Sequence, residues 1–119
     1  MTGPLAEALD YAQDQLTAAG ISAAIDPRDL NLPAVWITLA NVDLARLSAG
    51  AGTITLGLTA ITGDRGHPGT IADLDDLVAG IDRIHPGRAW DPRAVLLPSS
   101  GPTPLPALYT TITLEWRQS

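Results

Sequence analysis

The fold is decided by one stretch of regular alternation, Thr53-Ile54-Thr55-Leu56-Gly57-Leu58-Thr59-Ala60-Ile61-Thr62. Every second residue from Ile54 to Ala60 is apolar, and most of the residues between them are threonine. Near the C-terminus, Leu108-Tyr109-Thr110-Thr111-Ile112-Thr113-Leu114-Glu115-Trp116-Arg117 alternates in the same way. Successive side chains of a strand point to opposite faces, so both stretches predict long antiparallel strands with one face on a core.

Two other segments have the spacing of amphipathic helices. Residues 4–19 begin with a proline, carry an apolar stripe and are followed by Gly20, which suits a helix end. Residues 70–84 carry a second apolar stripe, with a capping-box pattern from Thr70 to Asp73 at the start. We expect both helices to pack these stripes on the sheet.

Shorter strands are predicted at residues 34–40 and 94–97. In the first, Val35, Ile37 and Leu39 are expected to face inward. Trp36 then lies on the opposite face, where it either packs beneath a loop or meets a partner.

The remaining segments read as connections. Residues 21–26 are a short strand or an extended link, and residues 41–52 are a helical turn or a projecting hairpin loop. Residues 63–69 and the proline-dense residues 98–106 are predicted to be loops. The resulting order predicts an α+β fold in one domain, residues 1–119. It has a single mixed or antiparallel sheet of four to five strands, with two helices packed on one face.

The composition narrows the classes of function. The net charge is −6, and the seven basic residues are scattered arginines, which argues against a large nucleic-acid-binding surface. The absence of cysteine excludes disulfides and thiolate chemistry. No apolar run is long enough to cross a bilayer and the N-terminus does not resemble a signal peptide, so we expect a soluble protein made in the cytoplasm. Arginine as the basic residue, with abundant Ala, Gly, Pro and Asp, is typical of a high-GC genome.

Few residues suggest catalysis or metal binding. The histidines at positions 67 and 85 do not stand at metal-ligand spacing, and His85 reads as a helix C-terminal residue. Asp73 and Asp76 share a helix face and could bind a cation, although first-turn acids that complement the helix dipole explain them better. Neither Ser99-Ser100-Gly101 nor Gly50-Ala51-Gly52 stands in the context that a nucleophile or phosphate loop requires. We therefore expect no enzyme, no cofactor and no metal.

The order of the elements resembles the tail terminator proteins of long-tailed, siphovirus-type bacteriophages. The resemblance covers nearly the whole chain and lies in architecture rather than in a unique motif. It is carried by residues 4–19, Ala34-Val35-Trp36-Ile37-Thr38-Leu39, residues 53–62, residues 70–84 and residues 109–116. It implies a virion protein, assembled in the cytoplasm of a bacterial host, that forms a hexameric ring and ends the tail tube on its head-proximal side.

The same resemblance implies the partners. These are further copies of the chain, the tail-tube protein, and the head-completion or connector proteins of the neck, with no membrane contact. DNA would pass through the ring without specific binding, since a strongly negative wall repels it. Two alternatives stay open: another neck component, such as a head-closure or tail-completion protein, and a host cytoplasmic protein-binding module.

Candidate contact residues follow from residue type and loop position. Tryptophan and arginine are favoured at interfaces, and apolar residues on a Gly-rich loop suggest a segment that packs against a neighbour. For Trp90, packing over the edge of the core is the alternative. The candidates are Trp36, Leu44, Arg46, Leu47, Asp64, Arg65, His67 and Trp90.

Overall fold

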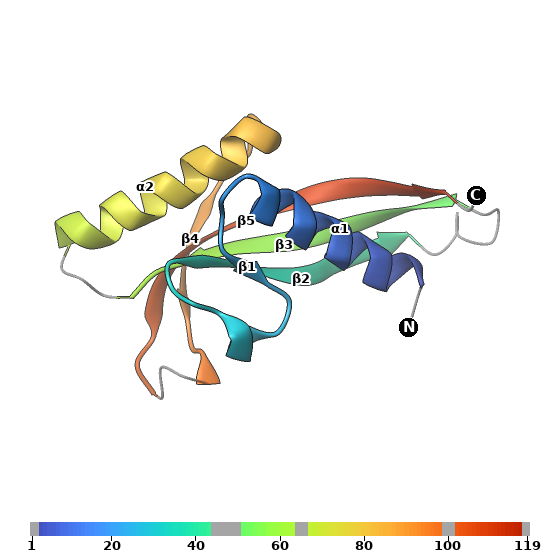
Figure 1. Cartoon of the computed structure of the whole chain (residues 1–119). Coiled ribbons are helices and arrows are strands. Elements are labelled where there is room, and N and C mark those ends of the chain that lie inside the picture. Colours follow the sequence, from blue (N-terminus) through green and yellow to red (C-terminus); the bar gives the residue numbers. More distant parts are fainter. Residues whose placement is uncertain (1–2, 44–50, 64–66, 99–101, 118–119) are drawn as a thin grey trace.

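The computed structural model describes residues 3–43, 51–63, 67–98 and 102–117. Within them the chain forms two α-helices, a short 3-10 helix and one five-stranded sheet (Figure 1). In chain order the elements are α1 (Pro4–Ala18), β1 (Ala23–Ala24), the 3-10 helix Pro27–Asp29, β2 (Ala34–Asp43), β3 (Ala51–Ile61), α2 (His67–Ile84), β4 (Asp91–Val95) and β5 (Leu105–Arg117).

The sheet is mixed and has the strand order β1-β2-β3-β5-β4. β1 runs parallel to β2, and the other neighbouring strands are antiparallel. The two strands predicted from alternation lie side by side at the centre, where Leu56 pairs with Ile112 and Thr55 pairs with Thr113. Apolar residues therefore meet apolar residues across the strands, and threonines meet threonines.

The main core lies on the face of the sheet that carries both helices, called here the helical face. Ile54, Leu56 and Leu58 of β3 are fully buried there. Helix α1 adds Ala8, Ala12 and Leu16, and α2 adds Leu77 and Ile81. The prediction of an α+β fold with two helices packed on one face of a single sheet is thus confirmed.

The ends of α1 follow from its flanking residues. Pro4 occupies the first turn, where its missing N–H costs nothing. At the other end Gly20 has φ +82°, and the N–H of Ile21 donates to the carbonyl of Leu16. This is a Schellman motif, and its left-handed glycine turns the chain back toward the sheet.

The opposite face carries a second, smaller core that the sequence did not predict. Ile61 of β3 is fully buried on this face. The chain around the 3-10 helix covers it with Leu30 and Leu32, while Trp36 packs against the same cluster. The other members of this second core are Leu97, Leu105, Ala107 and Val95. The sheet is therefore covered on both faces at this end.

Several predicted positions are wrong in detail. Leu39 pairs with the buried Leu56 and so lies on the inward side as predicted, but it is 44% exposed because this part of β2, beyond the end of β1, is at the edge of the arm. Helix α2 begins at His67, so Thr70 lies within its first turns and does not cap its start.

The last two strands also begin earlier than predicted. The short strand covers Asp91–Val95 rather than residues 94–97, and β5 starts at Leu105 within the predicted loop. Pro92 and Pro106 both stand in these strands, and Pro92 is tolerated because β4 is at the sheet edge. Residues 23–24 form a strand, which settles the alternatives for residues 21–26.

Candidate functional site

Five of the eight predicted contact residues lie outside the described residues. They are Leu44, Arg46, Leu47, Asp64 and Arg65. His67 is the first residue of α2, and its side chain is likewise outside the described part. The structure therefore places only the side chains of Trp36 and Trp90, and it does not bring these two together.

Trp36 is bound within its own chain. Its indole N–H donates to the carbonyl oxygen of Ile25 at 3.1 Å, and the half-buried ring packs against the second core. This is the local packing beneath a connecting segment that the sequence left open. A buried indole usually finds such a partner for its N–H.

Trp90 packs over the edge of the main core, in the segment between α2 and β4. The carbonyl of the preceding residue, Ala89, accepts a hydrogen bond of 2.8 Å from the hydroxyl of Thr110. Because Thr110 is buried in β5, this bond fixes the segment on the helical face. Part of the Trp90 ring remains accessible.

His85 links the two helices. Its Nε2 lies 3.0 Å from the Oε1 of Gln15 on α1. Burial lowers the pKa of His85 from its ordinary value of 6.5, and the neighbouring Arg88 lowers it further. The ring therefore stays neutral more readily than a free histidine, so its environment outweighs the attraction that a helix C-terminus has for a cation.

The prediction that Asp73 and Asp76 are first-turn acids is wrong, because α2 begins at His67 and has no acidic residue in its first turn. Asp73 accepts a hydrogen bond of 3.0 Å from the hydroxyl of Thr62, which holds α2 to the end of β3. Among the described residues, no group of three or more His, Asp or Glu side chains could hold a metal ion.

The most unusual feature of the sheet is a three-stranded arm. The arm consists of residues 37–42 of β2, 53–57 of β3 and 111–117 of β5. β1 pairs only with Val35 and Trp36, and β4 pairs only with residues 105–109. In the described part of the chain, both outer strands of the arm therefore have one side without a neighbouring strand. The arm extends toward the C-terminus in Figure 1 and contributes to a shape of 50 × 29 × 23 Å.

The two faces of the arm differ in chemistry. The face opposite the helices presents threonines, and the exposed hydroxyls of Thr55 and Thr113 lie 3.3 Å apart. Tyr109 lies at the base of this face, with the guanidinium of Arg93 4.0 Å from its ring centroid. Lysine is absent from the chain, so the two open edges of the arm lack the residue that proteins often place on edge strands to prevent pairing with another chain.

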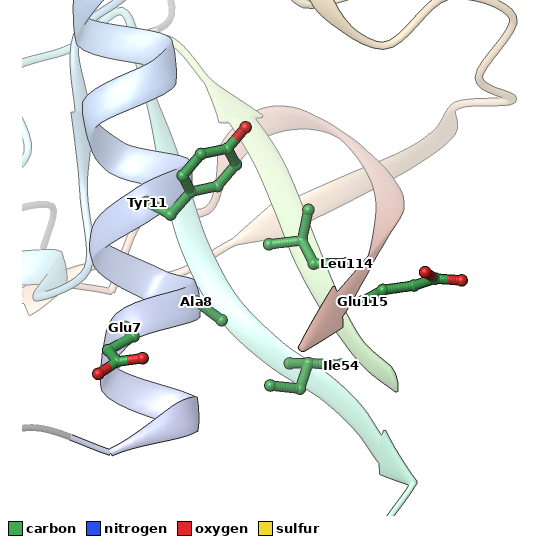
Figure 2. A pocket seen from close by; sticks show the side chains of 6 residues that line it. All are labelled: Glu7, Ala8, Tyr11, Ile54, Leu114 and Glu115. Carbon is green, nitrogen blue, oxygen red and sulfur yellow. The ribbon is translucent and has the colours of Figure 1, made fainter. Parts of the chain in front are cut away.

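On its helical face the arm borders a hollow of about 390 Å³. The hollow is lined by Glu7, Ala8 and Tyr11 of α1 and by Ile54, Leu114 and Glu115 of the arm. Figure 2 shows Leu114 and Ile54 facing α1 across it, with the ring of Tyr11 at one end. The two carboxylates point outward on opposite sides. Tyr11 is 56% exposed and stands one turn after Glu7 on α1.

Sequence reasoning missed both the arm and the hollow. The arm depends on where β1 and β4 end, and a two-residue strand has too little periodicity to be predicted. For the hollow, the available signal was Tyr11, an aromatic residue on the acidic side of α1.

Comparison with protein-family models, with curated proteins and with solved structures gives no significant match to this chain. In the described residues, neither helix is long and apolar enough to cross a membrane.

Proposed function

We propose that this chain is a structural subunit that joins copies of itself through the two open edges of the arm. The observation that carries the proposal is the arm. Residues 37–42 and 111–117 form opposite edges of the arm, and neither has a neighbouring strand within the described chain. The β2 edge has an irregularity between Leu39 and Asn41, but an edge without a neighbouring strand still offers backbone groups for pairing with a strand of another chain.

The two edges are different surfaces, and this decides the kind of assembly. When one edge of a copy meets the other edge of the next, the contact is heterologous and repeats around a ring or along a filament. A closed ring uses every edge. The exposed positions Leu39, Ala40 and Asn41 on the β2 edge supply the contact surface.

Such a ring suits the tail terminator role that the order of elements suggests. In this proposal six copies close on the head-proximal end of a bacteriophage tail tube, stop its growth and join it to the connector. A net charge of −6 per copy would let DNA pass without adhering. Another neck component would use the same arm, whereas a monomeric binding module would not require it. No catalytic role is proposed.

The test is an edge variant with a matched control. Leu39→Lys places a charge at the β2 edge, where the exposed side chain makes misfolding unexpected. Leu96→Lys makes the same change at a residue that is 61% exposed and lies outside the arm. We expect light scattering to show a closed oligomer for the wild type and for Leu96→Lys, and a monomer for Leu39→Lys. Equal assembly of all three would contradict pairing through this edge.

A further inference from the structure

We propose that the hollow between α1 and the arm receives an apolar side chain of a different protein, and that basic residues flanking this side chain pair with Glu7 and Asp14 of α1. The inference concerns the helical face of the arm and does not depend on ring formation at its edges.

The shape and lining of the hollow suit a single apolar anchor. Ala8, Ile54 and Leu114 make its walls apolar, and Tyr11 offers an exposed aromatic ring at one end (Figure 2). A volume of about 390 Å³ is enough for one large aliphatic side chain and the backbone that carries it. Anchors of this kind supply much of the binding energy of protein interfaces.

The acidic side chains near the hollow favour a partner that has basic residues next to its apolar anchor. Glu7 borders the hollow and forms no ion pair with a described side chain, whereas Glu115 follows Leu114 in β5 and points to the opposite face of the sheet. Asp14 is exposed about two turns after Glu7 on the same side of α1, and this helix has no basic residue in its sequence. A partner with a basic residue on each side of its apolar anchor would therefore meet two carboxylates of α1.

The same charge disfavours a second copy as the occupant. Each copy carries a net charge of −6, and the hollow lies in one of its acidic regions. Of the described arginines, Arg28 pairs with Asp26 at 2.8 Å and Arg93 lies over Tyr109, whereas Arg83 and Arg88 are exposed on or just after α2. A basic partner is attracted to the acidic side of α1, whereas a second copy brings a net negative charge toward it.

The experiment is an NMR titration of the full-length, isotope-labelled protein at low salt with the peptide acetyl-Gly-Arg-Leu-Arg-Gly-amide. We expect amide shifts centred on Ala8, Tyr11 and Leu114. The double variant Glu7→Gln, Asp14→Asn should bind about three- to tenfold more weakly, since each exposed ion pair contributes little. The control Asp75→Asn, Asp76→Asn changes the net charge equally on exposed residues of α2 and should bind like the wild type.

Two comparisons make the result decisive. The peptide with alanine in place of leucine should bind more weakly, because it lacks the anchor, and the peptide with glutamates in place of arginines should not bind. Equal weakening by both double variants would show attraction to net charge alone and overturn the proposal, as would an absence of shifts at the hollow. Shifts at the hollow that grow with protein concentration, before any peptide is added, would identify a second copy as the occupant and would also overturn it.

Discussion

Replacing Gly57 with alanine tests how closely two side chains approach the backbone at the base of the arm. Gly57 is buried in β3 between Thr38 of β2 and the ring of Tyr109, on the face opposite the helices. A Cβ atom at this position would lie 2.6 Å from the hydroxyl of Thr38 and 2.9 Å from both Cε1 and the hydroxyl of Tyr109.

The magnitude follows from these distances. Carbon atoms in contact prefer about 3.5–4.0 Å, so the Tyr109 ring must move by roughly 0.6–1 Å or change its rotamer, and the Thr38 hydroxyl must move as well. Overpacking of this kind costs about 1–3 kcal/mol. Alanine recovers about 0.5–1 kcal/mol because glycine is unfavourable within a strand. We therefore expect Gly57→Ala to lower the free energy of unfolding by about 1 kcal/mol.

The assay is urea unfolding followed by circular dichroism at one fixed protein concentration. Gly57→Ala is compared in the wild type and in a Tyr109→Thr background, where the ring is gone. In that background only the 2.6 Å approach to the Thr38 hydroxyl remains, so the loss of stability should be smaller, with a coupling energy of about 1 kcal/mol between Gly57→Ala and the Tyr109 ring. Gly63→Ala is the matched control, because a Cβ there would meet no atom within 4 Å. An equal loss of stability in both backgrounds would refute the account of Tyr109.

Three further changes test the packing. Trp36→Phe removes the hydrogen bond to Ile25 and should lower the free energy of unfolding by about 1 kcal/mol without loss of the fold, as read from urea midpoints. Leu56→Ala should cost about 2–5 kcal/mol in the same assay, since Leu56 is fully buried in the main core. The lowered pKa of His85 means that the unfolded chain binds the proton more tightly. The stability that the neutral His85 contributes is therefore complete above pH 6.5, and it is lost as the pH falls through the lower pKa of the folded state. The difference between the urea midpoints at pH 7.5 and at pH 5.5 should therefore be larger for the wild type than for His85→Asn.

The central strands and both helices could be predicted because their signals are local. In β3 the alternation of Ile54, Leu56 and Leu58 with threonine requires one buried face whatever lies beside it. The apolar stripe of α2 is equally independent of context, and Leu77 and Ile81 are buried as expected. Only the start of that helix was misplaced.

The errors came from features that depend on distant neighbours. Leu39 continues the inward pattern of β2, yet it is exposed because β1 ends at Ala24. Pro92 lies outside the strand predicted at residues 94–97, yet it belongs to β4, because a proline is compatible with a strand at the sheet edge. The hollow requires Tyr11 and Leu114, which are far apart in the sequence, to line the same space, and no local pattern encodes that arrangement.

The arm, with two different open edges, is the basis of the proposed assembly, and the most direct test is the mass of the protein in solution. We would measure it by light scattering over a range of concentrations and image the sample with tail-tube subunits by electron microscopy. The account predicts a closed oligomer, seen as six-membered rings or as discs that halt tube growth. A monomer at every concentration, with no effect on tubes, would contradict it.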